Sequence, residues 1–227
     1  MKSHLKRLDA PKSWVILRKE HTFITRPSAG AHPMDLGLPL TVVLKDLIHA
    51  ARTTREVKRA LGIKHVVVDG KRVRDHKRIV GLLDIISLTE SKENYRMTLG
   101  EDGTLMIKKI DAKEANHKVA KIIGKTMVKR GKLQVNLSDG RNILVGKDDV
   151  ATGDSLVIEV PSQKVIEHIK CQAGAQILII GGKRKGEQGK IVDIIKDEVL
   201  YQSKTGKFAT LKDYALVVGK DKPVVTL

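Results

Sequence analysis

Positively charged side chains crowd the stretch 52–75, and their spacing suits a surface that binds phosphate groups. Arg52, Arg55 and Arg59 are three and four residues apart, so in a helix they line one face. Val57 falls on another face of the same helix, which can therefore pack against a core while its cations face outward. The pattern predicts an RNA-binding element, and the alternative is a solvated basic face that only keeps a domain soluble.

The helix that would carry these arginines has clear start and stop signals. Thr53 is followed three residues later by Glu56, which is the capping-box spacing: the threonine oxygen accepts a free amide and the glutamate reaches back. This pair places the helix start at Thr54, and Gly62 is expected to end it. A short helix with a fixed beginning is therefore predicted.

A tight hairpin is expected directly after the helix. Residues 66–68 are three valines and residues 71–74 are rich in cations, with Asp69-Gly70 between them. Asp-Gly tolerates the positive φ angles of a type I′ turn, the turn that suits a two-residue hairpin. The turn would present its lysine and arginines beside the helix.

The net charge of the whole chain favours a polyanionic partner. Forty-three Lys and Arg oppose 26 Asp and Glu, a formal charge of +17 over 227 residues. Binding such a chain to phosphates releases counterions, so RNA is the expected partner. A membrane surface would require a basic amphipathic helix or a lipid anchor, and neither is found. The start of the chain is basic but is not followed by an apolar segment of signal-peptide length. No apolar run reaches the ~18 residues that a membrane-spanning helix needs. We therefore expect a cytoplasmic protein.

Motifs for catalysis, metals and cofactors are not recognised. Cys171 is the single cysteine, so neither an internal disulfide nor a Cys-rich zinc site is expected, and the eight histidines lack metal-ligand spacing. Gly181 and Gly186 have the glycine spacing of a P-loop, but Glu187 and Gln188 stand where the Lys and Ser or Thr would bind phosphates and Mg²⁺. We therefore expect no enzyme, no metal and no cofactor.

The six aromatic residues of the chain are Trp14, Phe23, Tyr95, Tyr201, Phe208 and Tyr214. They show no cluster on one strand pair that could stack bases, so we expect recognition through phosphates and RNA shape.

Composition and periodicity predict an α+β, multi-domain chain of four parts. Residues 1–38 are expected to form a basic arm that orders on a partner, with Trp14 and Phe23 as anchors, the alternative being a floppy tail. Residues 39–91 begin with an amphipathic helix pattern from Leu40 to Ala51 and end with the apolar run 79–86. Residues 92–170 are expected to form a β-rich part with a short helix from Asp111 to about Lys118 and the strands 95–99, 104–107, 132–137, 141–145 and 155–160. Residues 171–227 are expected to form a small barrel from the strands 176–180, 190–195, 198–201, 207–211 and 215–218.

Three of these features together resemble a known family. The segment 40–86 resembles the S-four-type RNA-binding module, or α-L motif, and 174–194 resembles a KOW motif. The segments His4-Leu5-Lys6-Arg7, Ala10-Pro11-Lys12 and 26–30 are similar to the opening of the archaeal and eukaryotic small-subunit ribosomal protein family S-four-e. The order of arm, S-four-type module, β-domain and KOW SH3-like barrel completes the resemblance, and the early end of the chain favours the archaeal form.

The resemblance implies a structural constituent of the small ribosomal subunit, which binds ribosomal RNA beside neighbouring ribosomal proteins and has no small-molecule substrate. Its implied RNA surface comprises Arg52, Arg55, Lys58, Arg59, Lys64, Lys71, Arg72 and Arg74. The implied KOW loop, 181–190, adds Lys183, Arg184, Lys185 and Lys190. The basic arm adds Lys2, Lys6, Arg7 and Lys12. Two alternatives stay open, because S-four-type modules also occur in RNA-modifying enzymes and KOW barrels occur in transcription or translation factors.

Overall fold

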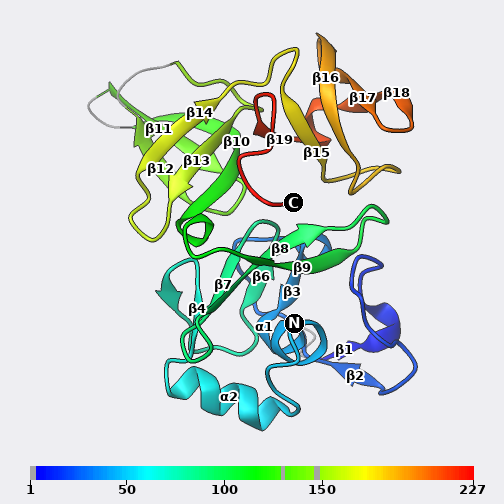
Figure 1. Cartoon of the computed structure of the whole chain (residues 1–227), viewed down its shortest axis with the longest axis vertical. Helices are drawn as coiled ribbons and strands as arrows, with labels where there is room; N and C mark the ends of the chain where they lie inside the picture. Colours follow the sequence, from blue (N-terminus) through cyan, green and yellow to red (C-terminus); the bar gives the residue numbers. More distant parts are fainter. Residues whose placement is uncertain (1–3, 129–130, 146–148) are drawn as a thin grey trace. The chain divides into compact units, whose positions relative to one another are not determined.

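The computed structural model describes residues 4–128, 131–145 and 149–227, and it is mostly β with few helices (Figure 1). The chain divides into two compact units. The first contains residues 1–98 and 104–116, and the second contains residues 99–103 and 117–227. The predicted multi-domain organisation is confirmed, but the helical share is smaller than an α+β chain implies. The division into four parts stays a prediction.

The first unit is built around a five-stranded sheet with the order β5-β4-β7-β8-β9. Its strands are β4 (Val66–Val68), β5 (Lys71–Arg72), β7 (Ile85–Leu88), β8 (Glu93–Leu99) and β9 (Leu105–Ile110). Two small sheets pair β1 (Leu5–Lys6) with β2 (Phe23–Ile24) and β3 (Gly37–Pro39) with β6 (Ile79–Gly81). Its helical segments are α1 (Leu40–Val42), a π-helical turn (Val43–Leu47), α2 (Thr54–Gly62) and three 3-10 turns, Arg7–Asp9, Met34–Leu36 and Glu114–Asn116.

The helix predicted from Leu40 to Ala51 is much shorter than expected. Regular α-helix covers only α1, and the π-helical turn that follows is closed by the amide of Ile48 donating to the carbonyl of Val43 at 2.9 Å. His49, with a φ of 58°, then turns the backbone away. Residues 40–44 are all buried, so packing on every side decides their conformation rather than one amphipathic stripe.

The described part of the predicted arm, residues 4–38, is folded as part of the first unit. The indole of Trp14 is 3% exposed and donates to the carbonyl of Met34 at 3.0 Å. The Ser13 hydroxyl donates to the carbonyl of Asp35 at 2.8 Å, and the Leu105 amide donates to the carbonyl of Ser13 at 2.7 Å. The expectation that Trp14 anchors on a partner is therefore wrong, because its ring is already a core residue.

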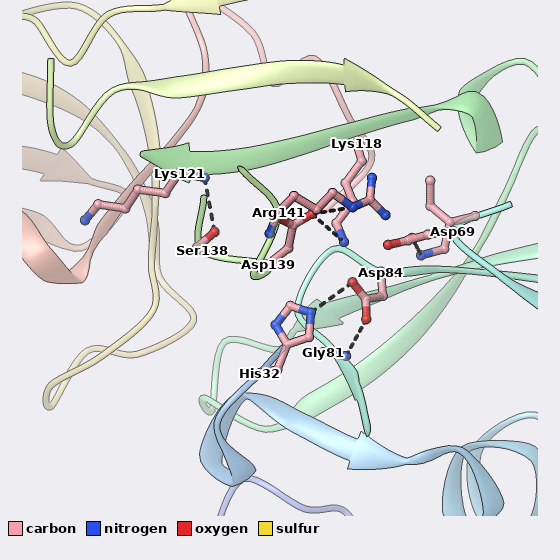
Figure 2. A network of polar contacts seen from close by, with 10 residues as sticks. His32, Asp69, Gly81, Asp84, Lys118, Lys121, Ser138, Asp139 and Arg141 are labelled. Carbon is pink, nitrogen blue, oxygen red and sulfur yellow. Dashed lines mark hydrogen bonds and ion pairs between the residues drawn. The ribbon is translucent and has the colours of Figure 1, made fainter. Parts of the chain in front are cut away.

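A buried histidine joins the arm to the loop after β6. The Nε2 atom of His32 lies 3.1 Å from Oδ1 of Asp84, while Oδ2 of Asp84 accepts the Gly81 amide at 2.8 Å (Figure 2). A Cβ atom at Gly81 would lie 2.0 Å from the His32 ring, so only glycine fits beneath it. The carboxylate therefore holds both the turn and the arm.

The second unit contains two five-stranded antiparallel sheets, with the orders β12-β11-β10-β13-β14 and β18-β17-β16-β15-β19. The first comprises β10 (His117–Val128), β11 (Lys132–Leu137), β12 (Asn142–Val145), β13 (Ser155–Glu159) and β14 (Val165–Ile169). The second comprises β15 (Gln176–Ile179), β16 (Gln188–Ile195), β17 (Glu198–Ser203), β18 (Gly206–Leu211) and β19 (Ala215–Gly219), with a 3-10 turn at Lys212–Tyr214. All five strands predicted after Cys171 are confirmed.

Two strands of the second unit were missed by the sequence interpretation, β14 and the long β10. Where a helix to about Lys118 was expected, only the short turn Glu114–Asn116 precedes β10. Buried lysines disguise this strand: Nζ of Lys118 lies 3.3 Å from Asp139, which also contacts Arg141 at 3.2 Å (Figure 2). Charges that normally mark an exposed face here lie inside because an acidic partner comes from a distant turn.

Lys121 links the two sheets of the second unit. Its ammonium group donates to the carbonyls of Lys212 and Asp213 at 2.7 and 2.8 Å. Its own amide donates to the Ser138 hydroxyl at 3.2 Å (Figure 2). Burial lowers the pKa of this lysine. The two carbonyls satisfy the buried ammonium, so the link is polar and directional.

Candidate nucleic-acid interface

The start of α2 is fixed by the predicted capping box. The amide of Glu56 donates to the Thr53 hydroxyl at 3.2 Å, and the Glu56 carboxylate accepts the amides of Arg52 and Thr53 at 2.7 and 3.4 Å. The hydrogen bond from the Arg52 backbone, followed by that from Thr53, lowers the pKa of Glu56. The cap sets which residues of α2 face outward, and the prediction of its start at Thr54 is confirmed.

Packing of α2 leaves its cations in solvent. Val57 and Leu61 are 0% and 1% exposed, which orients the helix against the first unit. All eight cations predicted on the helix, the following loop and the hairpin are exposed: Arg52, Arg55, Lys58, Arg59, Lys64, Lys71, Arg72 and Arg74. The structure therefore gathers them on neighbouring elements of one unit, and we call this set the α2–β5 surface.

The hairpin is tied to the end of the helix. Asp69 and Gly70 have φ angles of 49° and 69°, as a type I′ turn requires, and the buried Asp69 carboxylate accepts the amide of Ile85 at 2.9 Å. The guanidinium of Arg72 donates to the carbonyl of Gly62 at 2.9 Å. This bond caps a free carbonyl at the helix end and holds β5 beside α2.

Two further exposed cations continue the same run and were not predicted, Lys77 and Arg78. Between them and the hairpin lies His76, whose pKa is lowered by burial and then by the charge of Lys58. The signal that could have found them is the continuous basic stretch 71–78, which the sequence interpretation ended at residue 74.

The predicted KOW loop, 181–190, which runs from the β15–β16 loop into the start of β16, presents its cations differently. Lys183 is exposed, whereas Arg184 is held by Glu187 at 2.8 Å and lies 3.3 Å above the Phe208 ring centroid. Lys190 makes an exposed ion pair with Asp221 at 3.1 Å. The predicted cations of this loop are present, but two of them already have acidic neighbours.

Gly186 of this loop is a glycine for an internal reason. Its φ is +97°, and a Cβ atom there would lie 1.9 Å from the carbonyl oxygen of Gly100, which belongs to the same unit. Lys185, whose backbone and side chain pack on Gly103, belongs to the same contact. Glycine lets another group approach the backbone closely, and at Gly186 this group is the protein's own turn.

The predicted arm residues divide in the same way. Lys6 and Lys12 are exposed, and Lys2 lies outside the described residues. Arg7 is 6% exposed, and its guanidinium donates to the carbonyl of Leu17 at 2.6 Å and to Glu20 at 3.2 Å. The Arg7 side chain is therefore used inside the arm and is left out of the interface proposed below.

A second arginine of the arm has an unpredicted internal role. The guanidinium of Arg18 donates to the carbonyls of Ala10 and Pro11, each at 2.8 Å. Together with Arg7, it closes the arm on itself.

Comparison with known proteins accounts for the whole chain. The model of ribosomal family S4e matches residues 91–165, and the RS4NT domain matches residues 1–35. Small ribosomal subunit protein eS4 of Methanosphaera stadtmanae is 41% identical over 232 residues, covering 100% of this chain and 96% of the relative. The chain belongs to the S4e family of ribosomal proteins. The eS4 protein of Methanococcus vannielii is 38% identical over 240 residues, covering 100% of this chain and 98% of its own.

A solved member of the S4e family has a similar fold. The crystal structure of the 30S ribosomal protein S4e from Thermoplasma acidophilum superposes with a TM-score of 0.69 at 30% identity, covering 82% of this chain and 95% of that one. Membership of S4e confirms the family and the archaeal relatives expected from the sequence, and S4e is a non-enzymatic family.

Membrane spans and metal clusters are not found in the described part of the chain. No helix within residues 4–128, 131–145 and 149–227 is long and apolar enough to cross a membrane. In the same described residues, no group of three or more His, Cys, Asp or Glu side chains could hold a metal ion.

Proposed function

We propose that this S4e protein is a structural constituent of the small ribosomal subunit that binds ribosomal RNA and supports subunit assembly and translation. The observation that carries the proposal is the α2–β5 surface, where eight cations project from a capped helix, its following loop and a braced hairpin into solvent. Phosphate neutralisation by such cations supplies most of the affinity for RNA. The names of the eS4 relatives support the same assignment.

The S-four-type module, 39–91, would be the principal RNA-docking element. Side chains cannot reach into the deep major groove of A-form RNA, so cations on a rigid surface read the backbone geometry of a folded RNA instead. The arm, 1–38, and the KOW SH3-like barrel, 171–227, would add contacts through Lys6, Lys12, Lys183 and Lys190. The β-rich part, 92–170, would join the modules, and neighbouring small-subunit proteins would cover the remaining surface.

Binding of the purified chain to deproteinised small-subunit ribosomal RNA tests the proposal. The affinity should exceed that for an unrelated RNA duplex of equal length, and the logarithm of the binding constant should fall linearly with the logarithm of salt concentration. The chain should also co-sediment with small subunits in stoichiometric amount. Equal affinity for the duplex, or recovery with RNA polymerase in place of small subunits, would contradict it.

A further inference from the structure

A pocket of about 360 Å³ opens beside the loop between β15 and β16. Its walls combine glycine backbone, cations and aromatic rings from the loop, from β17 and β18 and from the 3-10 turn before β19. The lining residues that matter here are Gly181, Gly182, Lys183, Arg184, Tyr201 and Tyr214. The pocket lies wholly within the second unit, and its volume is in the range of small-ligand sites.

Arg184 forms one planar wall of this pocket. Its guanidinium carbon lies 3.3 Å above the centroid of Phe208, and its Nη1 atom donates to Glu187 at 2.8 Å. The side chain remains 40% exposed, so one face rests on the ring while the outer part is accessible. A guanidinium held over a ring in this way can also stack on a nucleobase.

The support beneath Arg184 is rigid. Tyr201 is fully buried and its hydroxyl donates to the second carboxylate oxygen of Glu187 at 3.1 Å. Burial, together with this bond to Glu187, raises the pKa of Tyr201 to about 12. Tyr201 and Phe208 are also cross-strand partners with ring centroids 6.1 Å apart. The sequence analysis predicted no cluster of aromatic rings on one strand pair, and the contact between Tyr201 and Phe208 on β17 and β18 shows that this prediction is wrong.

Tyr214 forms the second planar wall. The residue is 40% exposed, and a Cβ atom at Gly181 would lie 2.6 Å from its ring. Glycine at this position therefore lets the ring lie directly against the loop backbone. At Gly182, which has a φ of +81°, a Cβ atom would lie 3.5 Å from the same ring, so this residue continues the glycine wall.

We propose that this pocket takes one unpaired nucleobase of the bound RNA, stacked on Arg184 and Tyr214, while Lys183 contacts an adjacent phosphate. The inference rests on the proposed function and narrows it, since it assigns the barrel loop to base stacking. Glu187 balances the charge of Arg184. The pocket therefore favours a planar base, which can stack on its side chains, over a free phosphate, which needs an unbalanced positive charge. Every base has a π face, so stacking here carries little sequence preference.

The first test compares two small probes that differ only by the base. Full-length protein labelled with ¹⁵N is titrated with adenosine monophosphate and, separately, with ribose 5-phosphate. The nucleotide should shift the amide signals of Gly181, Gly182 and Tyr214, and ribose 5-phosphate should leave them nearly unchanged. Equal shifts from both probes would show a phosphate site and would overturn the base pocket.

The second test uses an RNA hairpin with one unpaired adenosine and the same hairpin with an abasic site at that position. The wild-type chain should bind the adenosine form about tenfold more tightly. Tyr214→Leu and Arg184→Lys should each reduce this ratio towards one, although the second keeps its positive charge. Lys164→Glu, on an exposed site away from the pocket, should keep the ratio. Circular dichroism identifies any variant that fails to fold. The affinity ratio of the wild-type chain for the two hairpins tests the pocket even if every variant fails to fold.

The outcomes separate this inference from the proposed function. If the wild-type chain binds small-subunit ribosomal RNA with the expected salt dependence but the hairpin ratio is one, the base pocket is wrong and the proposed function stands. If the chain binds neither the ribosomal RNA nor the hairpins, the proposed function fails, and the pocket inference fails with it.

Discussion

On the α2–β5 surface the cations project into solvent from a capped helix, whereas Arg184 of the β15–β16 loop and Lys190 of β16 are engaged by Glu187 and Asp221. The first region fixes its backbone and presents its cations to solvent, with Arg72 also hydrogen-bonded to the end of the helix. The second region fixes its charged side chains as well. Similar basic sequences thus yield one surface suited to counterion release and one suited to a shaped contact.

The difference also extends to the glycines. A Cβ atom added at Gly62, which ends α2, would meet nothing within 4 Å in the described residues beyond its chain neighbours and its own helix, whereas one added at Gly186 would lie 1.9 Å from the carbonyl oxygen of Gly100. Substitution of the glycine should therefore be tolerated in the first region and costly in the second, whereas charge reversal should weaken RNA binding more in the first region than in the second.

The largest expected effect is on stability, from Gly186→Ala. The methyl group would collide with backbone at a φ of +97°, so the free energy of unfolding should fall by about 3 kcal/mol or more. Urea denaturation measures it. The matched change Gly62→Ala should alter stability by no more than about 1 kcal/mol, in the stabilising direction. Equal losses from both would abolish the contrast between the two regions.

The next effect is on RNA binding, from the double change Arg55→Glu with Arg59→Glu. Affinity for small-subunit ribosomal RNA should fall on the order of 10- to 100-fold, and the salt slope should fall by about two, because two phosphate contacts are lost. Filter binding at several salt concentrations measures both.

The matched control for this pair is Lys132→Glu with Lys164→Glu, which changes the charge equally on exposed sites of the second unit. It should weaken binding less. Loss of folding in the arginine pair, seen by circular dichroism, would show that these arginines are structural.

A smaller effect concerns the buried anchor of the loop. The Tyr201 hydroxyl has a pKa of about 12 in the folded state, whereas the pKa of an unfolded tyrosine is about 10. The wild-type free energy of unfolding should therefore fall as pH rises from about 10 to 12, by up to roughly 1.4 kcal/mol per pH unit. Tyr201→Phe should lack this component. Parallel pH profiles for both proteins would disprove the raised pKa.

The smallest effect is at the cap of α2. Thr53→Ala removes the acceptor for the Glu56 amide and should cost about 1 kcal/mol of stability in urea denaturation. Thr53→Ser should restore most of it. RNA affinity should change little, because the arginine side chains remain. A large loss of affinity in a folded Thr53→Ala protein would show that the cap orients the cations more strongly than proposed.

Local signals in the sequence predicted the elements that need few distant contacts. The Thr53 and Glu56 spacing indicated the start of α2, and Asp69-Gly70 indicated the hairpin, since both depend on neighbours in the chain. The five strands of the last sheet followed from alternation and turns. The exposure of the cations on α2 could be predicted because Val57 must be buried, and the opposite face of the helix is then exposed to solvent.

Features that depend on distant partners could not be predicted. Lys118 is buried beside Asp139, Arg7 donates to Leu17 and Glu20, and Arg184 rests on Phe208. Each cation has the sequence appearance of a surface charge. The stacked pocket is hidden for the same reason, because its rings come from separate elements of the last sheet.

The bond from the Leu105 amide to the Ser13 carbonyl has a consequence for synthesis on the ribosome. The chain emerges from its N-terminus, so the partner of Ser13 is made about 90 residues later, on the order of 5–20 s at ordinary elongation rates. His32 must likewise wait for Asp84. The first residues to be translated are thus among the last of their unit to be ordered, and closure of the arm marks completion of that unit.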